Sequence, residues 1–60
     1  MAYDNIIRKS IKTVDALMRK NGYRVVNTIK NPYGYIVEYE GNMDSMLIIF
    51  NEKGKAENIL

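Results

Sequence analysis

Residues 23–40, YRVVNTIKNPYGYIVEYE, hold two stretches of alternating side chains separated by a turn signal. Because successive side chains of a strand point to opposite faces, each stretch predicts a strand with two distinct faces. Between them, Pro32 presets the second position of a tight turn and Gly34 accepts a positive φ as a bulge. The pattern predicts an antiparallel hairpin with strands at about 23–30 and 35–40.

A three-residue loop with its bulge at Gly34 gives the expected register of this hairpin. The expected cross-strand neighbours are Ile29 with Tyr35, Val25 with Tyr39, and Arg24 with Glu40. The opposite charges of the last pair favour this register.

Downstream of the hairpin, the uncharged run MLIIF at 46–50 predicts a third strand with apolar side chains on both faces. The turn NEKG at 51–54 repeats the N-x-x-G spacing of NPYG, so a short fourth strand is expected at about 56–60. Upstream, a helix is expected at 4–21. The fold class that follows is α+β, in one domain of residues 1–60: an N-terminal helix packed on an antiparallel three- or four-stranded meander, α-β-β-β-β in two layers.

The helix is predicted from apolar side chains that recur on one arc, with charged side chains on the other. The apolar set is Ile6, Ile7, Ile11, Val14, Leu17 and Met18, with Tyr3 beside it. We expect Asp4 to cap the first turn. At the other end, Asn21 and Gly22 predict a Schellman stop, after which Tyr23 folds back on Met18.

Composition limits the chemistry that this chain can perform. Its 60 residues include no Cys and no His, so no disulfide, thiolate site or imidazole site can form, and we expect no metal and no cofactor. The glycines lie at expected turns and form no phosphate-binding loop. A chain of this length hardly encloses a substrate pocket while keeping a core, so we expect no enzyme and no small-molecule substrate.

The longest apolar run has five residues, against roughly 20 for a membrane span, and the N-terminus lacks the apolar core of a signal peptide. We therefore expect no membrane association and a soluble protein in the cytoplasm of a bacterial or host cell. A composition of 47% hydrophobic and 27% charged residues is typical of a folded globule.

One helix covers only one face of the sheet, which leaves the other face as a candidate protein interface. We expect the helix to cover Val25, Ile29, Tyr35, Val37, Tyr39, Met46, Ile48 and Phe50. The candidate interface comprises the apolar Val26, Ile36, Leu47 and Ile49 with the charged Arg24, Glu38 and Glu40 at the rim. Two alternatives stay open: the terminal Ile59 and Leu60 fold over this face, or the exposure is the scattered apolar surface of any protein. Glu38 and Glu40 are interpreted as solvated rim residues, not as a catalytic pair.

A basic helix face is the alternative site. Residues 1–30 carry seven basic and two acidic side chains, a net charge of +5, whereas residues 31–60 carry two basic and five acidic ones, a net charge of −3. The candidate phosphate contacts are Arg8, Lys9, Lys12, Arg19 and Lys20. Asp15 interrupts this face. Tyrosines at 23, 35 and 39 are expected to serve the core, not to stack on bases, which leaves Tyr33 in the turn exposed.

The junction LMRKNGYRVV, Leu17–Val26, resembles the passage from helix through Asn-Gly-aromatic to strand in the HicA-type ribonuclease toxins. The resemblance covers ten of the 60 residues and implies a fold like double-stranded-RNA-binding domains, α-β-β-β-α. The catalytic histidine and the closing helix of that family have no counterpart here. Ribonuclease activity is therefore not carried over.

The hypothesis that follows is a small non-catalytic protein-binding module that acts through its apolar outer sheet face, by self-association as a homodimer or by docking a target. Residues with AT-rich codons, such as Ile, Asn and Lys, are frequent and indicate a low-GC genome, so an inhibitor of a host factor encoded by a phage or mobile element is one version of it. The alternative is a nucleic-acid-binding module that uses the basic helix face.

Overall fold

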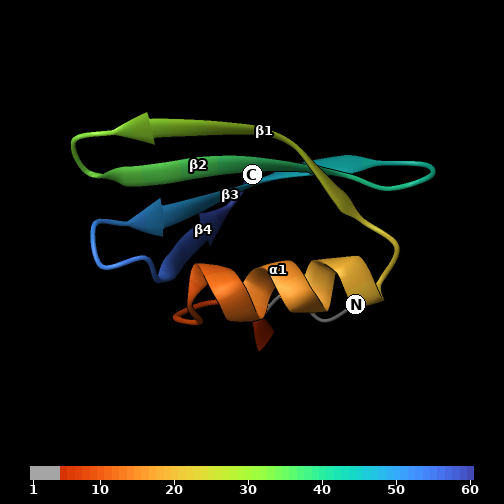
Figure 1. The fold of residues 1–60 in the computed structure, drawn as a ribbon, viewed down its shortest axis with the longest axis horizontal. Coiled ribbons are helices and arrows are strands. Elements are labelled where there is room, and N and C mark those ends of the chain that lie inside the picture. The colour runs from red at the N-terminus through yellow and green to blue at the C-terminus, as the bar shows by residue number, and fades with distance from the viewer. Residues whose placement is uncertain (1–4) are drawn as a thin grey trace.

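The computed structural model describes residues 5–60 and shows one helix followed by four strands. The elements are α1 (Ile11–Lys20), β1 (Arg24–Asn31), β2 (Gly34–Glu40), β3 (Ser45–Asn51) and β4 (Ala56–Ile59). The strands form one antiparallel sheet of order β1-β2-β3-β4, with α1 on one side of it (Figure 1). The predicted α+β class is thus confirmed. The last element of the chain is the strand β4, whereas the HicA-type toxins have a closing helix at this point.

The helix is shorter than predicted, because it begins at Ile11 and not at residue 4. Its N-cap is Ser10, whose side-chain oxygen accepts a hydrogen bond from the Thr13 N–H at 3.3 Å. The predicted cap, Asp4, and the neighbouring Tyr3 lie outside the described residues.

Backbone pairing with the start of β4 explains the late start of the helix. The Arg8 N–H donates to the Ala56 carbonyl at 2.7 Å, and the Ala56 N–H donates to the Lys9 carbonyl at 2.8 Å. Arg8 has a φ of 71°, which turns the chain between Ile6 and the helix. Ile6 is fully buried, so its apolar character serves the core from a turn and not from the helix.

The helix ends as predicted. The Gly22 N–H donates to the Arg19 carbonyl at 3.1 Å and the Tyr23 N–H to the Met18 carbonyl at 2.9 Å, the two bonds of a Schellman motif. Gly22 has a φ of 86°.

The hairpin register differs from the prediction near its turn. Arg24 lies opposite Glu40 and Val25 opposite Tyr39, as predicted, but Ile29 lies opposite Ile36 and not Tyr35. The loop has two residues between the paired Asn31 and Gly34, and the Asn31 side chain accepts from the Tyr33 N–H at 2.8 Å. The bulge therefore falls between Val25 and Asn27, not at Gly34.

The displaced bulge reverses the faces of the second half of β1. Residues opposite each other in an antiparallel pair share a face, so Ile29 lies on the outer face with Ile36. Thr28 and Lys30 point to the inner face, which α1 covers in part. The prediction that the helix covers Ile29 was wrong.

The core lies between α1 and the inner faces of β2 and β3. Its buried members are Ile6, Val14, Met18, Val37, Tyr39, Met46, Ile48, Phe50 and Ala56. β1 forms one edge of the sheet; it begins next to the end of α1, runs away from the helix (Figure 1) and buries none of its side chains. Val25 is consequently 37% exposed, so the prediction that it is covered was also wrong.

Candidate protein-binding surface

The outer face of the sheet carries aliphatic side chains from three strands near its centre. Cross-strand pairing aligns Ile29, Ile36 and Ile49 in one row and Asn27, Glu38 and Leu47 in the next. We call these six residues the outer patch. Five of them, all but Ile49, line a depression of about 330 Å³. Three strands thus place aliphatic side chains around one hollow.

The structure brings together most of the residues that the sequence suggested for this surface. Ile36, Leu47 and Ile49 share the outer face and are half-buried. Val26 stands at the bulge and is 43% exposed, outside the aligned rows. Ile29, which is 51% exposed, and Asn27 are the members that sequence reasoning missed, because their assignment depended on where the bulge falls.

The C-terminus does not fold over the outer patch. Ile59 lies opposite the buried Ile48 and packs against the core. Leu60 exchanges two backbone hydrogen bonds with Leu47 and extends the sheet, with its side chain 65% exposed. The structure therefore does not show the first of the two alternatives, in which Ile59 and Leu60 fold over this face.

Charged groups lie at one side and at the middle of this face. Arg24 and Glu40 form an ion pair of 2.8 Å at the strand ends, and both side chains are largely exposed, so the pair contributes under about 1 kcal/mol. Glu38 lies between Asn27 and Leu47 and has no ion pair among residues 5–60. Two copies stacked face to face bring these Glu38 carboxylates together, which disfavours that arrangement.

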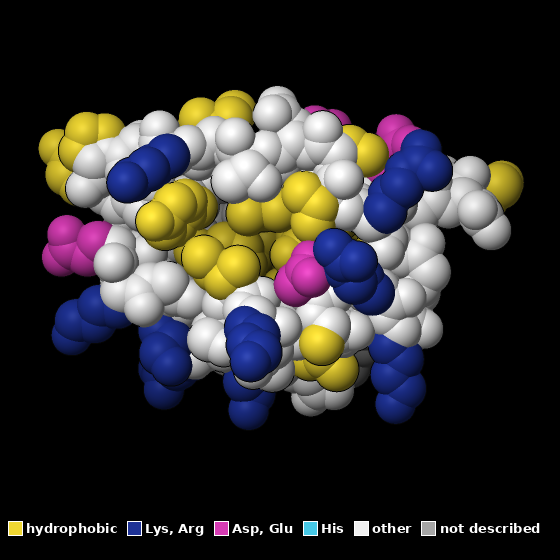
Figure 2. Space-filling view, in the orientation of Figure 1, with side chains coloured by type: hydrophobic (Ala, Val, Ile, Leu, Met, Phe, Trp, Pro, Cys, Tyr) yellow, Lys and Arg dark blue, Asp and Glu magenta, His cyan; other side chains and the backbone are white. Residues whose placement is uncertain are grey.

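The five basic residues of the alternative site are not on one helix face. Lys12, Arg19 and Lys20 belong to α1, whereas Arg8 and Lys9 lie in the turn that pairs with β4. Arg19 is bound by Asp15 at 2.8 Å. Figure 2 shows Lys and Arg side chains along the α1 side, and an apolar hollow between the helix and the sheet with an acidic and a basic group beside it.

The tyrosines do not form a stacking platform. Tyr39 is fully buried, and the Tyr23 hydroxyl donates to Asp44 at 2.7 Å. Tyr33 is 82% exposed in the β1–β2 turn. Tyr35 is half-buried, so the tyrosines serve the core and its rim as the sequence predicted.

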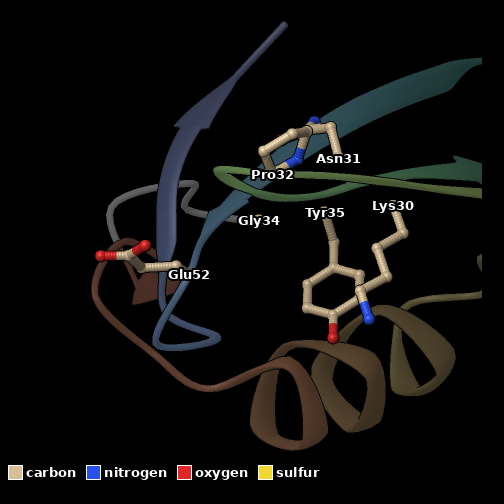
Figure 3. Close-up of a pocket in the computed structure, with 6 residues that line it drawn as sticks. All are labelled: Lys30, Asn31, Pro32, Gly34, Tyr35 and Glu52. Carbon is tan, nitrogen blue, oxygen red and sulfur yellow. The ribbon is translucent and has the colours of Figure 1, made fainter.

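A second hollow, of about 240 Å³, lies beside the β1–β2 turn. Its lining residues are Lys30, Asn31, Pro32, Gly34, Tyr35 and Glu52. In Figure 3, Lys30 and Tyr35 lie side by side and point toward α1, whereas Glu52 lies apart from them. Lys30 and Tyr35 therefore do not meet the Glu52 carboxylate at one point where the three could act on the same group.

The hydroxyl of Tyr39 is buried without a hydrogen-bond partner among the residues described. Burial, reinforced by the Asp15 carboxylate and opposed by Arg19, raises the pKa of Tyr39 from 10.0 to about 12. As pH rises from 10, the unfolded chain loses this proton while the folded chain keeps it. The stabilising effect of keeping Tyr39 protonated in the folded chain is therefore fully present below pH 10, and the free energy of unfolding falls as pH rises toward 12.

Replacing Tyr39 with Phe is expected to leave the free energy of unfolding at neutral pH unchanged or to raise it by up to about 2 kcal/mol, because an unpaired buried hydroxyl is removed and the ring is kept. The variant should also lose the alkaline fall in stability from this group, at most about 1.4 kcal/mol per pH unit. Urea unfolding of both proteins at about pH 7 and about pH 11 measures these differences. A marked loss of stability at neutral pH would show that the hydroxyl has a partner.

Comparison of the chain with protein-family models, with curated proteins and with solved structures finds no match. Within residues 5–60, no helix has the length and apolar character needed to cross a membrane.

Proposed function

We propose that this chain is a small non-catalytic module that binds another protein through the outer face of its sheet. The observation that supports the proposal is the alignment of Ile29, Ile36 and Ile49 across three strands, beside a hollow that no other described element covers. Exposed apolar surface of this kind, with charged groups at its side, is typical of protein interfaces.

The free energy available from the outer patch suits a modest affinity. Full burial of an aliphatic side chain contributes about 1.5–3 kcal/mol, and these side chains are already half-buried, so four of them contribute on the order of 3–6 kcal/mol. Association costs about 4 kcal/mol or more. A partner held by this patch therefore needs further contacts beside it.

The proposal also includes the kind of genome that encodes the protein and the compartment in which it acts. Small size and an AT-rich codon signature suit a protein of a phage or mobile element that inhibits a factor of its host, acting in the cytoplasm. Lysate from a low-GC bacterium is accordingly the material in which to look for a partner.

Replacing Ile49 with Glu is expected to abolish partner binding while the fold survives, because it places a carboxylate in the apolar row without touching the inner face. Met43→Glu is the matched control: it makes the same change of charge at a loop residue that is 95% exposed. Both variants and the wild type serve as bait in such a lysate, washed at about 0.5 M salt to screen ionic contacts. Circular dichroism checks that each bait is folded.

The proposal requires a protein that the wild type and Met43→Glu retain and Ile49→Glu loses. Retention that Ile49→Glu does not change contradicts it. Nucleic acid that is retained at low salt and released by the wash at about 0.5 M salt supports the basic side chains instead. Sedimentation equilibrium over a wide concentration range shows whether the outer patch is occupied by a second copy.

A further inference from the structure

β1 is an open sheet edge. It pairs only with β2, and no segment of residues 5–60 pairs with its other side. The opposite edge of the sheet is treated differently, because residues 8–11 form hydrogen bonds with 54–56 along the start of β4. Figure 1 shows β1 as the outermost strand, which runs away from α1 beyond its first residues. Its unpaired N–H and C=O groups are a template for another strand.

The alternation of backbone directions identifies the residues that face this edge. Leu47 and Leu60 exchange hydrogen bonds of 3.2 and 2.8 Å, so Leu47 directs its backbone groups toward β4. Neighbouring residues of a strand direct theirs to opposite sides. Leu47 lies opposite Glu38, and Glu38 lies opposite Asn27, so the backbone groups of Asn27 and Ile29 point toward β2. The backbone groups of Thr28 and Lys30 therefore point toward the open edge.

The stretch of β1 beyond the bulge is regular from Asn27 to Asn31. An added strand lies about 4.8 Å away and sets its side chains beside those of β1. On the outer face it meets Ile29 and the hollow of the outer patch. On the inner face it meets Lys30, which has no ion pair in the described part of the chain and lies beside Tyr35 (Figure 3).

We propose that β1 receives an extended segment of another protein in which an aliphatic residue stands next to an acidic one. The aliphatic side chain enters the outer patch beside Ile29, and the carboxylate pairs with Lys30. The inference rests on the proposed function and names the conformation and chemistry of its partner. Backbone hydrogen bonds to Thr28 and Lys30 supply the contacts that the outer patch lacks.

A second copy of the chain fits this edge less well. The charged residues of β1 are Arg24 and Lys30, near its two ends, and neither strand offers a carboxylate. Arg24 lies on the outer face and Lys30 on the inner face, so two-fold antiparallel pairing of β1 with itself leaves both Lys30 side chains without an acidic partner. The bulge at Val26 further restricts pairing between identical edges.

The test uses a displayed library of random peptides as the probe and the whole chain as the target. Selection on the wild type is expected to enrich peptides with Asp or Glu next to Ile, Leu, Val or Phe, without helical spacing. Selection on Lys30→Glu is expected to enrich Lys or Arg at the acidic position. A wild-type selection without acidic residues, or with apolar residues three and four apart, overturns the proposal.

A synthetic copy of an enriched peptide then shows whether the peptide binds the open edge of β1 or only the outer face of the sheet. A chain of this length can be prepared by chemical synthesis with an N-methyl group on one amide. N-methylation of Thr28 removes a donor from the open edge and is expected to weaken the peptide by about tenfold or more, whereas N-methylation of the exposed Met43 should change nothing. Lys30→Glu, which leaves the backbone intact, is expected to weaken the same peptide to a similar extent. NMR spectra verify the fold of each protein.

The remaining outcomes distinguish this inference from the proposed function. If Leu47→Glu abolishes binding of the peptide and N-methylation of Thr28 does not, the outer patch binds without strand addition, and only this inference fails. If neither change affects binding, both fail. If the wild type self-associates and N-methylation of Thr28 abolishes the association, the occupant is a second copy and the chemistry assigned to the partner is wrong.

Discussion

Phe50→Ala is expected to remove about a third or more of the free energy of unfolding of this chain. Phe50 is 1% exposed and lies on the inner face of β3, opposite Tyr35 on one side and Ala56 on the other. Replacing a buried Phe by Ala costs about 3–5 kcal/mol, because the surroundings do not close around the cavity. A domain of this size has a total stability of roughly 3–9 kcal/mol. The loss is therefore about a third of the total stability at the least, and at the lower end of this range it unfolds the chain.

Urea unfolding followed by circular dichroism measures this effect, with Tyr33→Ala as control. Tyr33 is 82% exposed in a turn, so its truncation should shift the free energy of unfolding by no more than about 0.5 kcal/mol. A cooperative Phe50→Ala protein within about 1 kcal/mol of the wild type would show that β3 does not have the central place in the core that the structure gives it.

The elements that sequence reasoning predicted well are those whose signals are local. The Schellman stop depends on Asn21, Gly22 and Tyr23 alone, and both of its hydrogen bonds form. Alternation placed Ile36, Leu47 and Ile49 on one face because β2 and β3 pair without irregularity. Local spacing and backbone chemistry are sufficient for such features.

The wrong predictions concern features that depend on distant contacts. The helix begins late because Arg8 and Lys9 bond with Ala56, which is far away in sequence. No helical periodicity reports such a partner, and Ile6 is apolar in either arrangement. The candidate basic face fails as a single helix surface for the same reason, since Arg8 and Lys9 lie in this paired turn.

The bulge explains the mistaken part of the candidate surface. NPYG is compatible with a two-residue and with a three-residue loop, and one residue of difference reverses the face of every side chain up to the bulge. The two-residue loop holds, so Ile29 joins the outer patch and Lys30 turns inward. The predicted meander places the first strand at an edge of the sheet, but which of its backbone groups point outward depends on the bulge, so the outward direction of Thr28 and Lys30 was not predictable.

Replacing Gly34 with Ala is expected to destabilise the sheet by about 3 kcal/mol or more, through a conformation and a contact that only glycine allows. Gly34 has a φ of 145°, and a Cβ placed on it collides with the Phe50 carbonyl oxygen and lies 2.7 Å from the Asn51 carbonyl carbon. Both atoms belong to the backbone of β3 and cannot rotate away. Relief requires β2 and β3 to separate where the β1–β2 turn meets them.

Gly22 provides the matched control for Gly34. Its φ of 86° is also unfavourable for Ala, but a Cβ there meets nothing within 4 Å, so Gly22→Ala should cost only about 1 kcal/mol. Urea unfolding of the two variants separates backbone strain from steric contact, and equal losses would contradict the close approach of β2 and β3. A shift of this turn also moves Ile29 relative to Ile36, so Gly34→Ala should disturb the outer patch whereas Gly22→Ala leaves it intact.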